Sequence, residues 1–261
     1  MKKLLALMLT LVLGVCGLSV FTACGKIEPI PETEGYTLKI GYTKYEPMNY
    51  FDENNKFVGH DTEFAQKVCA DLGYNPKFIE IDWNSKETSL NAGEIDLIWN
   101  GMTITDELKE KILISDPYLE NQQVIVVKKD SANKFKSVED LAKASSIAYE
   151  KGSAADTLIS ENEALKDVTK VECSAQRDAF LEVFANTSEV AVVDVTMAKA
   201  MTSPGTDYSA SLTYTDIGFE KEEYGIGMRK IDTRLCEKIN NLIAQYKEDG
   251  TLEALYDKYI A

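Results

Sequence analysis

The sequence predicts an α/β protein with largely parallel sheets, and two observations lead to this fold class. Short apolar runs typical of buried strands alternate with amphipathic segments typical of helices along most of the chain. The 261 residues are 44% hydrophobic, which is enough for a substantial core in one or two domains. We find no internal repeat or low-complexity tract, which argues against a solenoid or a disordered chain.

The N-terminal residues indicate export. Two lysines precede an uncharged, mostly apolar run over residues 4–20, as in a secretory signal peptide. The run ends in FTACG, which resembles a bacterial lipoprotein signal, so we expect residues 1–23 to be removed and lipid to be attached to Cys24. An uncleaved transmembrane anchor is the alternative. Residues 24–35, rich in Pro, Glu and Gly, are predicted to be a tether. The domain that it carries is expected to be extracytoplasmic, at the outer face of the membrane or in the periplasm.

The charge balance excludes several classes of partner. The sequence has 28 Lys+Arg against 43 Asp+Glu, a formal charge of −15, which repels nucleic-acid phosphates. One histidine and five cysteines without a CxxC pair predict no metal site, and we expect no cofactor. Cys69 lies on the apolar face of a predicted helix and is expected to be a buried free thiol; a disulfide between two of Cys69, Cys173 and Cys236 stays open.

Hydrophobic periodicity places the elements of the first half. Asp61 is predicted to cap a helix that buries Phe64, Val68 and Leu72, and His60 beside it is expected to be a surface or capping residue. Strands are predicted at residues 38–42, 78–81, 95–99 and 123–127. Helices are predicted at residues 61–72 and 85–92, with a helical turn at 107–111.

The second half repeats the alternation. Ser137 and Ser174 precede predicted helices and are expected to be their N-caps. Strands are predicted at residues 146–149, 168–171, 190–193, 212–214 and 225–228. Helices are predicted at residues 137–141, 153–160, 174–185, 196–201, 233–247 and 252–259.

The turns that follow the strands are the candidate site, because parallel sheets bind ligands at the carboxyl ends of their strands. Aromatic faces, hydroxyl groups, a glycine, a helix N-terminus and a carboxylate would meet there, and this set suits a small zwitterion or cation. Ordinary packing is the alternative for Trp83, and helix capping is the alternative for Thr103 and Asp194. The candidate residues in these turns are Tyr45, Trp83, Gly101, Met102, Thr103, Glu150, Ser153, Ala154 and Asp194.

Six segments in a fixed order resemble one family, the extracellular solute-binding proteins of polar amino acid ABC transporters, which includes the glutamine- and histidine-binding proteins. These segments are IGYTKYEPMNYFDENNKFVGHDTEFA, IWNGMTITDELKEK, SDPYLENQQVIVV, VAVVDVT, EEYGIGMRK and DGTLEALYDKY.

The resemblance implies a two-lobe periplasmic-binding-protein-like (type II) fold with the ligand between the lobes. Two hinge strands are then expected near residues 119–123 and 220–224. Lobe 1 would comprise residues 36–120 plus 224–261, and lobe 2 residues 121–223.

The resemblance also implies how the ligand is held. Tyr45 and Trp83 match an aromatic pair that sandwiches the ligand side chain, with cation–π attraction if that side chain is charged. The carbonyl of Gly101, beside Met102, and the carboxylate of Asp194 match the groups that receive the ligand ammonium.

The ligand carboxylate is expected to meet Thr103 and the backbone N–H groups at Ser153 and Ala154, because a helix N-terminus attracts anions.

Two positions depart from the family pattern. Leu108 stands where the family has an arginine that clamps the ligand carboxylate, and Glu150 stands where Lys or Gln is usual. Lys109, Lys111 or Lys151 would be a replacement for the arginine, although lysine lacks its planar fork. We therefore hypothesise that the ligand is cationic or an amine, or a small amino acid held only by helix amides and Thr103.

The resemblance implies a binding protein that captures a solute by hinge closure and delivers it to an ABC permease, as a monomer and without catalysis. One alternative is an enzyme similar to the cyclohexadienyl dehydratases, with Glu46 or Glu150 as acid or base. Another is a sensor that reports the ligand to a receptor. In the remaining acidic segment, Glu220, Glu222 and Glu223 are expected to form a solvated loop that is available to the permease.

Overall fold

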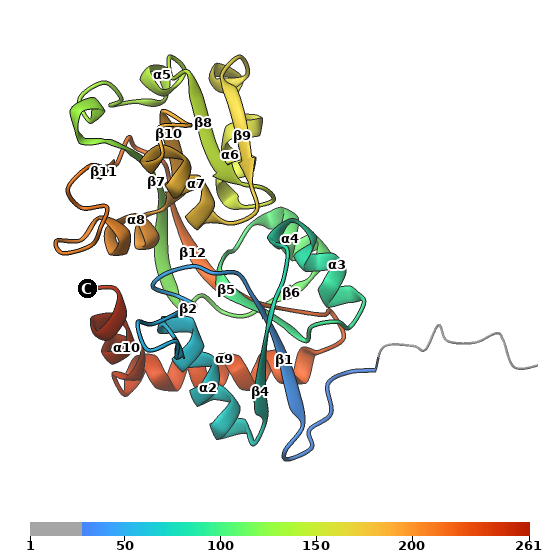
Figure 1. Ribbon diagram of the computed structural model, residues 1–261. Coiled ribbons are helices and arrows are strands. Elements are labelled where there is room, and N and C mark those ends of the chain that lie inside the picture. The colour runs from blue at the N-terminus through green and yellow to red at the C-terminus, as the bar shows by residue number, and fades with distance from the viewer. Residues whose placement is uncertain (1–27) are drawn as a thin grey trace, which may run out of the picture.

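The computed structural model describes residues 28–261, so the predicted signal peptide and lipid-bearing Cys24 lie outside the described residues. Figure 1 shows two α/β halves, one above the other, joined by the long strands β7 (Leu119–Lys128) and β12 (Lys221–Met228). The predicted α/β fold class is confirmed, but the sheet is mixed rather than largely parallel, because β7 and β12 pair antiparallel with their neighbours. Within residues 28–261, none of the helices is both long and apolar enough to cross a membrane.

The first half, the lower one in Figure 1, is built on a mixed sheet. Strand β1 (Thr37–Tyr42) pairs in parallel with β4 (Asn75–Glu80) and β5 (Leu97–Thr103), and β12 pairs antiparallel with β5. Shorter strands are β2 (Tyr50–Phe51), β3 (Phe57–Val58) and β6 (Leu113–Ile114). The helices are α2 (His60–Leu72), η1 (Trp83–Ser85), α3 (Lys86–Asn91), α4 (Asp106–Lys111), α9 (Thr233–Glu248) and α10 (Thr251–Tyr259).

The helices of this half follow the predicted apolar spacing. Phe64 and Val68 of α2 are fully buried, and the Phe64 ring meets Trp99 of β5 edge-on at 4.9 Å between centroids. In α9, residues at 3–4 spacing such as Leu235 and Ile239 face the same core. This packing fixes β5, and therefore the turn that follows it, against the rest of the half.

The second half, the upper one in Figure 1, has β7 and its neighbours at its centre. Strand β10 (Val190–Asp194) lies between β7, which it pairs antiparallel, and β8 (Ser146–Glu150), which it pairs in parallel. The outer strands are β9 (Thr169–Cys173) and β11 (Leu212–Thr215). The helices are η2 (Lys129–Ser131), α5 (Val138–Leu141), α6 (Ala154–Glu161), η3 (Glu163–Leu165), α7 (Gln176–Phe184) and α8 (Val195–Thr202).

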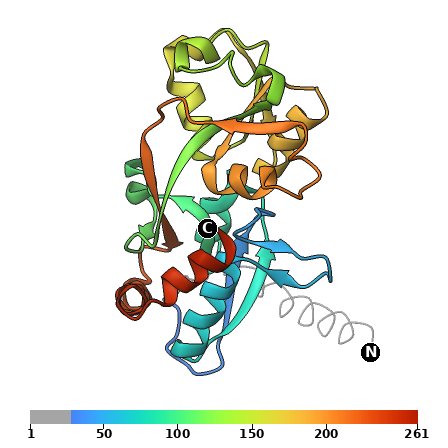
Figure 2. The same ribbon diagram turned by 90° about the vertical axis from the view of Figure 1, so that its left-hand side faces the viewer.

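Strands β7 and β12 carry the chain between the halves, as Figure 2 shows from the side. They pair antiparallel where they cross, with Asn121 opposite Glu222 and Gln122 opposite Lys221. Beyond the crossing, Gln123 of β7 pairs with Asp194 at the end of β10. The register therefore brings the crossing and the end of β10 together.

Two predictions around α2 are wrong. The N-cap of α2 is Gly59, and Asp61 lies inside the helix. The Asp61 carboxylate is fully buried and accepts hydrogen bonds from the Gly101 N–H and the Tyr118 hydroxyl, both at 2.7 Å. His60 is buried rather than at the surface, 1% exposed, with its Nδ1 3.0 Å from Asp61. Asp61 was misjudged because its partners Gly101 and Tyr118 are 40 or more residues away, and His60 because its ring stacks on the same Tyr118.

Of the predicted N-caps, Ser137 is confirmed, since its hydroxyl accepts from the Asp140 N–H, whereas Ser174 is wrong. Helix α7 is capped by Ala175, and the Ser174 hydroxyl donates to Asp178 instead. Cys69, Cys173 and Cys236 are free thiols, and Cys69 is buried as predicted.

The end of the predicted tether packs on the first half. Ile30 is 8% exposed, and its N–H donates to the buried Asp232 carboxylate at 2.8 Å. Glu32 forms an ion pair with Lys238 of α9 at 2.6 Å. The segment from Ile30 onward is thus part of the folded domain.

Candidate ligand-binding site

A cavity of about 290 Å³ lies between the two halves. Strand β5, η1, α3 and α4 of the first half supply one side, and the end of β8, the start of α6, Gln176 and Asp194 supply the other. The lining residues are Trp83, Asn84, Lys86, Glu87, Asn100, Gly101, Met102, Thr103, Thr105, Glu107, Leu108, Lys111, Glu150, Gly152, Ser153, Ala154, Thr157, Gln176 and Asp194. All the predicted site residues except Tyr45 are among them.

Asp194 ends β10 and is 2% exposed. Its carboxylate accepts hydrogen bonds from the side-chain amides of Asn121 (2.8 Å), Gln123 and Gln176. No helix-capping hydrogen bond is made by this side chain. Within residues 28–261, no lysine, arginine or histidine forms an ion pair with Asp194. Its charge is therefore held only by neutral dipoles and is available to a cation in the cavity.

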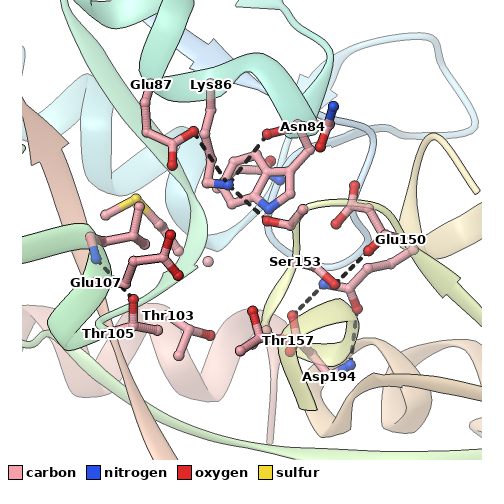
Figure 3. A pocket seen from close by; sticks show the side chains of 18 of the residues that line it. Asn84, Lys86, Glu87, Thr103, Thr105, Glu107, Glu150, Ser153, Thr157 and Asp194 are labelled. Atoms are coloured by element: carbon pink, nitrogen blue, oxygen red, sulfur yellow. Dashed lines mark hydrogen bonds and ion pairs between the residues drawn. The ribbon is translucent and has the colours of Figure 1, made fainter. Parts of the chain in front are cut away.

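Glu150, the last residue of β8, is also 2% exposed and lines the same part of the cavity (Figure 3). Its Oε1 has no hydrogen-bond partner among the described residues. Burial, and secondly the charge of Asp194, raise the pKa of Glu150 well above its usual range. A buried carboxyl oxygen without a partner is costly, so a donor from a ligand would stabilise it.

The opposite side carries cations that are already paired (Figure 3). Lys86 is 5% exposed; its Nζ donates to the Gly152 carbonyl across the cavity at 2.8 Å and lies 3.8 Å from Glu87. Burial lowers the pKa of Lys86, an effect that Glu87 and Glu150 oppose. Lys111 pairs with Glu107 at 2.6 Å and lies 3.8 Å from Glu87.

Helix α6 begins at the cavity. Ser153 is its N-cap: the hydroxyl accepts from the Asp156 N–H at 3.3 Å and donates to the Glu150 carbonyl at 2.7 Å. The positive end of this helix, at Ala154, therefore points toward the cavity, as a ligand carboxylate requires.

Tyr45 does not line the cavity. It is 1% exposed, and its hydroxyl is hydrogen-bonded to that of Tyr224 at 2.7 Å. The ring lies behind Gly101, where an added Cβ would come within 2.7 Å of it. Gly101 has a φ of 59°, so only a residue without a Cβ fits easily here. The expected sandwich of Tyr45 and Trp83 is absent from this arrangement, and Lys86 Nζ instead lies 5.0 Å from the Trp83 ring centroid.

The remaining predicted residues lie between these groups. The Thr103 hydroxyl donates to Glu222 at 3.0 Å, and Leu108 packs in one apolar cluster with Trp83 and Met102.

Of the proposed substitutes for the missing arginine, only Lys111 lines the cavity. Lys109 and Lys151 pair with Asp106 and Glu172 outside it.

Sequence reasoning missed several lining residues, Lys86 and Gln176 among them, and it misplaced Glu222, which accepts a hydrogen bond from the lining residue Thr103. Lys86 reaches the cavity only because Gly152 of the other half stands opposite it, and Gln176 only because α7 begins next to Asp194. Glu222 was assigned to a solvated loop, but it is mostly buried and accepts hydrogen bonds from Thr103, Asn121 and Gln123. Alternation along strand β12 was the available signal, since Glu222 points inward while its neighbours Lys221 and Glu223 are exposed.

The fold and the site together define an α/β binding protein with two halves and a polar, ligand-sized cavity between them. The chain belongs to the bacterial extracellular solute-binding proteins, family 3, whose family model matches residues 38–261.

Relatives of known specificity bind different amino acids. The L-cystine-binding protein TcyJ of Escherichia coli (strain K12) is 28% identical, covering 94% of this chain and 90% of its own length. The glutamine-binding protein GlnH of Bacillus subtilis (strain 168) is 32% identical, with coverages of 79% and 74%. The crystal structure of an ancestral amino acid-binding protein described as a precursor of cyclohexadienyl dehydratase matches with a TM-score of 0.77 at 32% identity, covering 86% and 96%. An ancestral arginine-binding protein bound to arginine matches with a TM-score of 0.80 at 31% identity, covering 88% and 100%.

Proposed function

We propose that this protein is the solute-binding subunit of an ABC importer, which captures an amino acid or a related amine between its halves and delivers it to the permease. The observation that carries the proposal is the pair Asp194 and Glu150, two buried carboxyl groups at the cavity without a cationic partner among residues 28–261. The ligand-binding roles named for the relatives support the same class of solute.

Each group of the ligand has a counterpart. The ligand ammonium binds the Asp194 carboxylate and the Gly101 backbone. A ligand carboxylate, where present, meets the start of α6 at Ser153 and Ala154, close to the Thr103 hydroxyl. Trp83 and Met102 cover the apolar part of the ligand. Closure of the two halves about β7 and β12 excludes water from these contacts.

The charges favour a ligand with more positive than negative groups. Leu108 offers no charge to a carboxylate, and the cations Lys86 and Lys111 already have acidic or carbonyl partners. Glu150 has an oxygen free to accept a second ammonium, amidine or guanidinium group. We therefore place cationic amino acids and their decarboxylated amines ahead of neutral and acidic ones.

The proposal includes the cellular setting. Lipid on Cys24 would hold the monomeric protein at the outer face of the membrane or in the periplasm, beside the permease that accepts its ligand. Binding without catalysis fits this setting.

The test is a thermal-shift screen with the purified protein, unfolded and refolded beforehand to remove carried-over ligand. The panel holds the standard amino acids, their decarboxylated amines and polyamines. A ligand at about 100 times its Kd stabilises the fold by about 2.7 kcal/mol, which is easily measured. Arginine, lysine or their amines are expected to give the largest shifts. No shift from any member would contradict the proposal.

The variant Leu108→Arg tests how the protein binds the carboxylate of its ligand. It supplies the guanidinium that the family uses, so amino acids with a free carboxylate should bind more tightly while the matching amines should not. Leu108→Met, which fills similar space without charge, is the control. An equal change for both ligand classes, or no gain for amino acids, would count against the roles given to the α6 N-terminus.

A dehydratase is the second candidate, favoured by one observation: Glu150 is a buried carboxyl at the cavity with a raised pKa, as a general acid requires. The missing arginine argues against it, because the substrates of such enzymes carry carboxylates. Turnover of prephenate or arogenate by the purified protein, lost in Glu150→Gln, would support this candidate over simple binding.

A further inference from the structure

A network of hydrogen bonds joins Asp194 to Glu222 on the crossing strand β12. The Asn121 amide nitrogen donates to Asp194 Oδ1 at 2.8 Å and to Glu222 Oε1 at 2.5 Å. The Gln123 amide nitrogen donates to the same two oxygens. Each amide group has two N–H protons, and each donates one to Asp194 and the other to Glu222, so the two amides link the two carboxyl groups. The Thr103 hydroxyl adds a third hydrogen bond to Glu222 Oε1.

The two carboxyl groups are close together and lack a counter-charge. Their oxygens share two donor atoms within hydrogen-bond distance, and Asp194 is 2% exposed. Like charges at such a separation in a poorly solvated site oppose double ionisation. Because Oε1 of Glu222 already accepts three hydrogen bonds, its other oxygen is the place for a proton.

The charged groups around the pair do not relieve this repulsion. Glu150 of β8, whose pKa burial and the charge of Asp194 raise, supplies no positive charge, and the Lys86 ammonium of α3 is directed to the Gly152 carbonyl. On the crossing strands, Lys221 pairs with Glu120 at 3.4 Å at the surface. The hydroxyls of Tyr45 and Tyr224 are neutral and bonded to each other. Burial, and secondly Asp194, raise the pKa of Glu222 to about 7.

We propose that Glu222 is a proton-bearing partner of the ligand-binding carboxylate Asp194, and that a ligand ammonium displaces its proton to solvent. The inference rests on the proposed function, because it requires a cation to bind at Asp194. The reaction balances as one ligand cation bound and one proton released: the incoming charge neutralises Asp194, and the Glu222 carboxyl then ionises against Asn121, Gln123 and Thr103. By linkage, cation affinity rises with pH through the range in which Glu222 loses its proton.

The test is calorimetry of the purified protein with L-arginine and agmatine at pH 6 in buffers of different ionisation enthalpy. The guanidinium and ammonium groups of both probes stay protonated at this pH, so any released proton comes from the protein or its linked groups. We expect close to one proton released per ligand by the wild type and an increase in affinity of several-fold per pH unit above pH 6. Glu222→Gln keeps the acceptor oxygen, mimics the protonated carboxyl, and should release close to none with a flat pH profile.

Glu223→Gln is the matched control, because it makes the same exchange at the exposed neighbour on β12 and should behave like the wild type. Equal proton release by the wild type and Glu222→Gln would overturn the inference and leave the proposed function intact. Failure of both probes and of the whole amine and amino acid panel to bind would overturn the proposed function, and the linkage with it. A purely structural role for Glu222 would change affinity without changing the number of protons released.

Discussion

The two sides of the cavity differ in how their charged side chains are balanced. On the side formed by α3 and α4, Lys86 and Lys111 face Glu87 and Glu107, so each charge has an opposite neighbour. On the other side, Glu150 and Asp194 have no cation within ion-pair distance among residues 28–261. Balanced charges contribute little selectivity, whereas an unbalanced buried carboxylate demands a cation. Under the proposed function, the ends of β8 and β10 are therefore where ligand charge is selected.

The largest loss of ligand affinity is expected for the variant Asp194→Asn. It removes the charge that we propose receives the ligand ammonium, and loss of one partner of a buried charge pair costs several kcal/mol. We expect at least a hundredfold weaker binding, about 2.7 kcal/mol, by calorimetry with the strongest ligand of the screen. Asp178→Asn, an exposed carboxylate on α7, is the control. Binding by Asp194→Asn within threefold of the wild type would refute the role of Asp194.

The next effect concerns stability and extends the comparison to Glu222. Its pKa is raised from 4.5 to about 7, so the folded protein holds this proton more tightly than the unfolded chain does. The free energy of unfolding of the ligand-free wild type should therefore fall as pH rises from about 4.5 to about 7, by on the order of 2 kcal/mol from this group. Urea unfolding at several pH values should show this component in the wild type and in Glu223→Gln. Its persistence in Glu222→Gln would be incompatible with the assignment.

Glu150→Gln gives a smaller and more selective effect. It keeps one acceptor oxygen but removes the negative charge that Glu150 can offer a second cationic group, and it leaves Asp194 in place. We expect about tenfold weaker binding of agmatine or L-arginine, about 1.4 kcal/mol, and less than threefold for L-glutamine, in parallel titrations. An equal loss of affinity for all three ligands would mean that Glu150 determines the shape of the cavity and does not discriminate ligands by charge.

The smallest effect is expected on the balanced side. Glu107→Gln breaks the pair with Lys111, but these side chains are 64% and 48% exposed, so water compensates for most of the loss. Affinity should change by less than twofold in the same titrations. A tenfold change in affinity would show that the side formed by α3 and α4 also selects ligand charge. The proposed difference between the two sides would then be wrong.

Local pattern was sufficient for most of the fold because burial repeats with the period of each element. The strand over β10 and the helix α9 were predicted from apolar spacing alone, and the site residues that directly follow β5, β8 and β10 line one cavity because those strand ends meet. The short strands β2, β3 and β6 were missed because two residues carry no periodicity.

The errors occur where a side chain depends on a distant segment. Tyr45 passes behind Gly101 to reach Tyr224, which is 179 residues further along the chain. Asp61 resembles an N-cap locally but binds the Gly101 N–H in the neighbouring strand. Lys86 reaches Gly152 through the approach of the two halves, and Glu222 reaches Asn121 and Gln123 through the register of β7 with β12. No short window of sequence contains these relations.

The second half of the molecule is one continuous stretch of chain inserted into the first, entered through β7 and left through β12, while β1, α9 and α10 all belong to the first half (Figure 1). Reporter design follows directly from this topology. Two fluorophores on β4 and α10 would keep a constant separation while the halves move, whereas one on α10 and one on α5 would register every movement. The first pair is thus a built-in reference for the second, in the same molecule and under the same illumination.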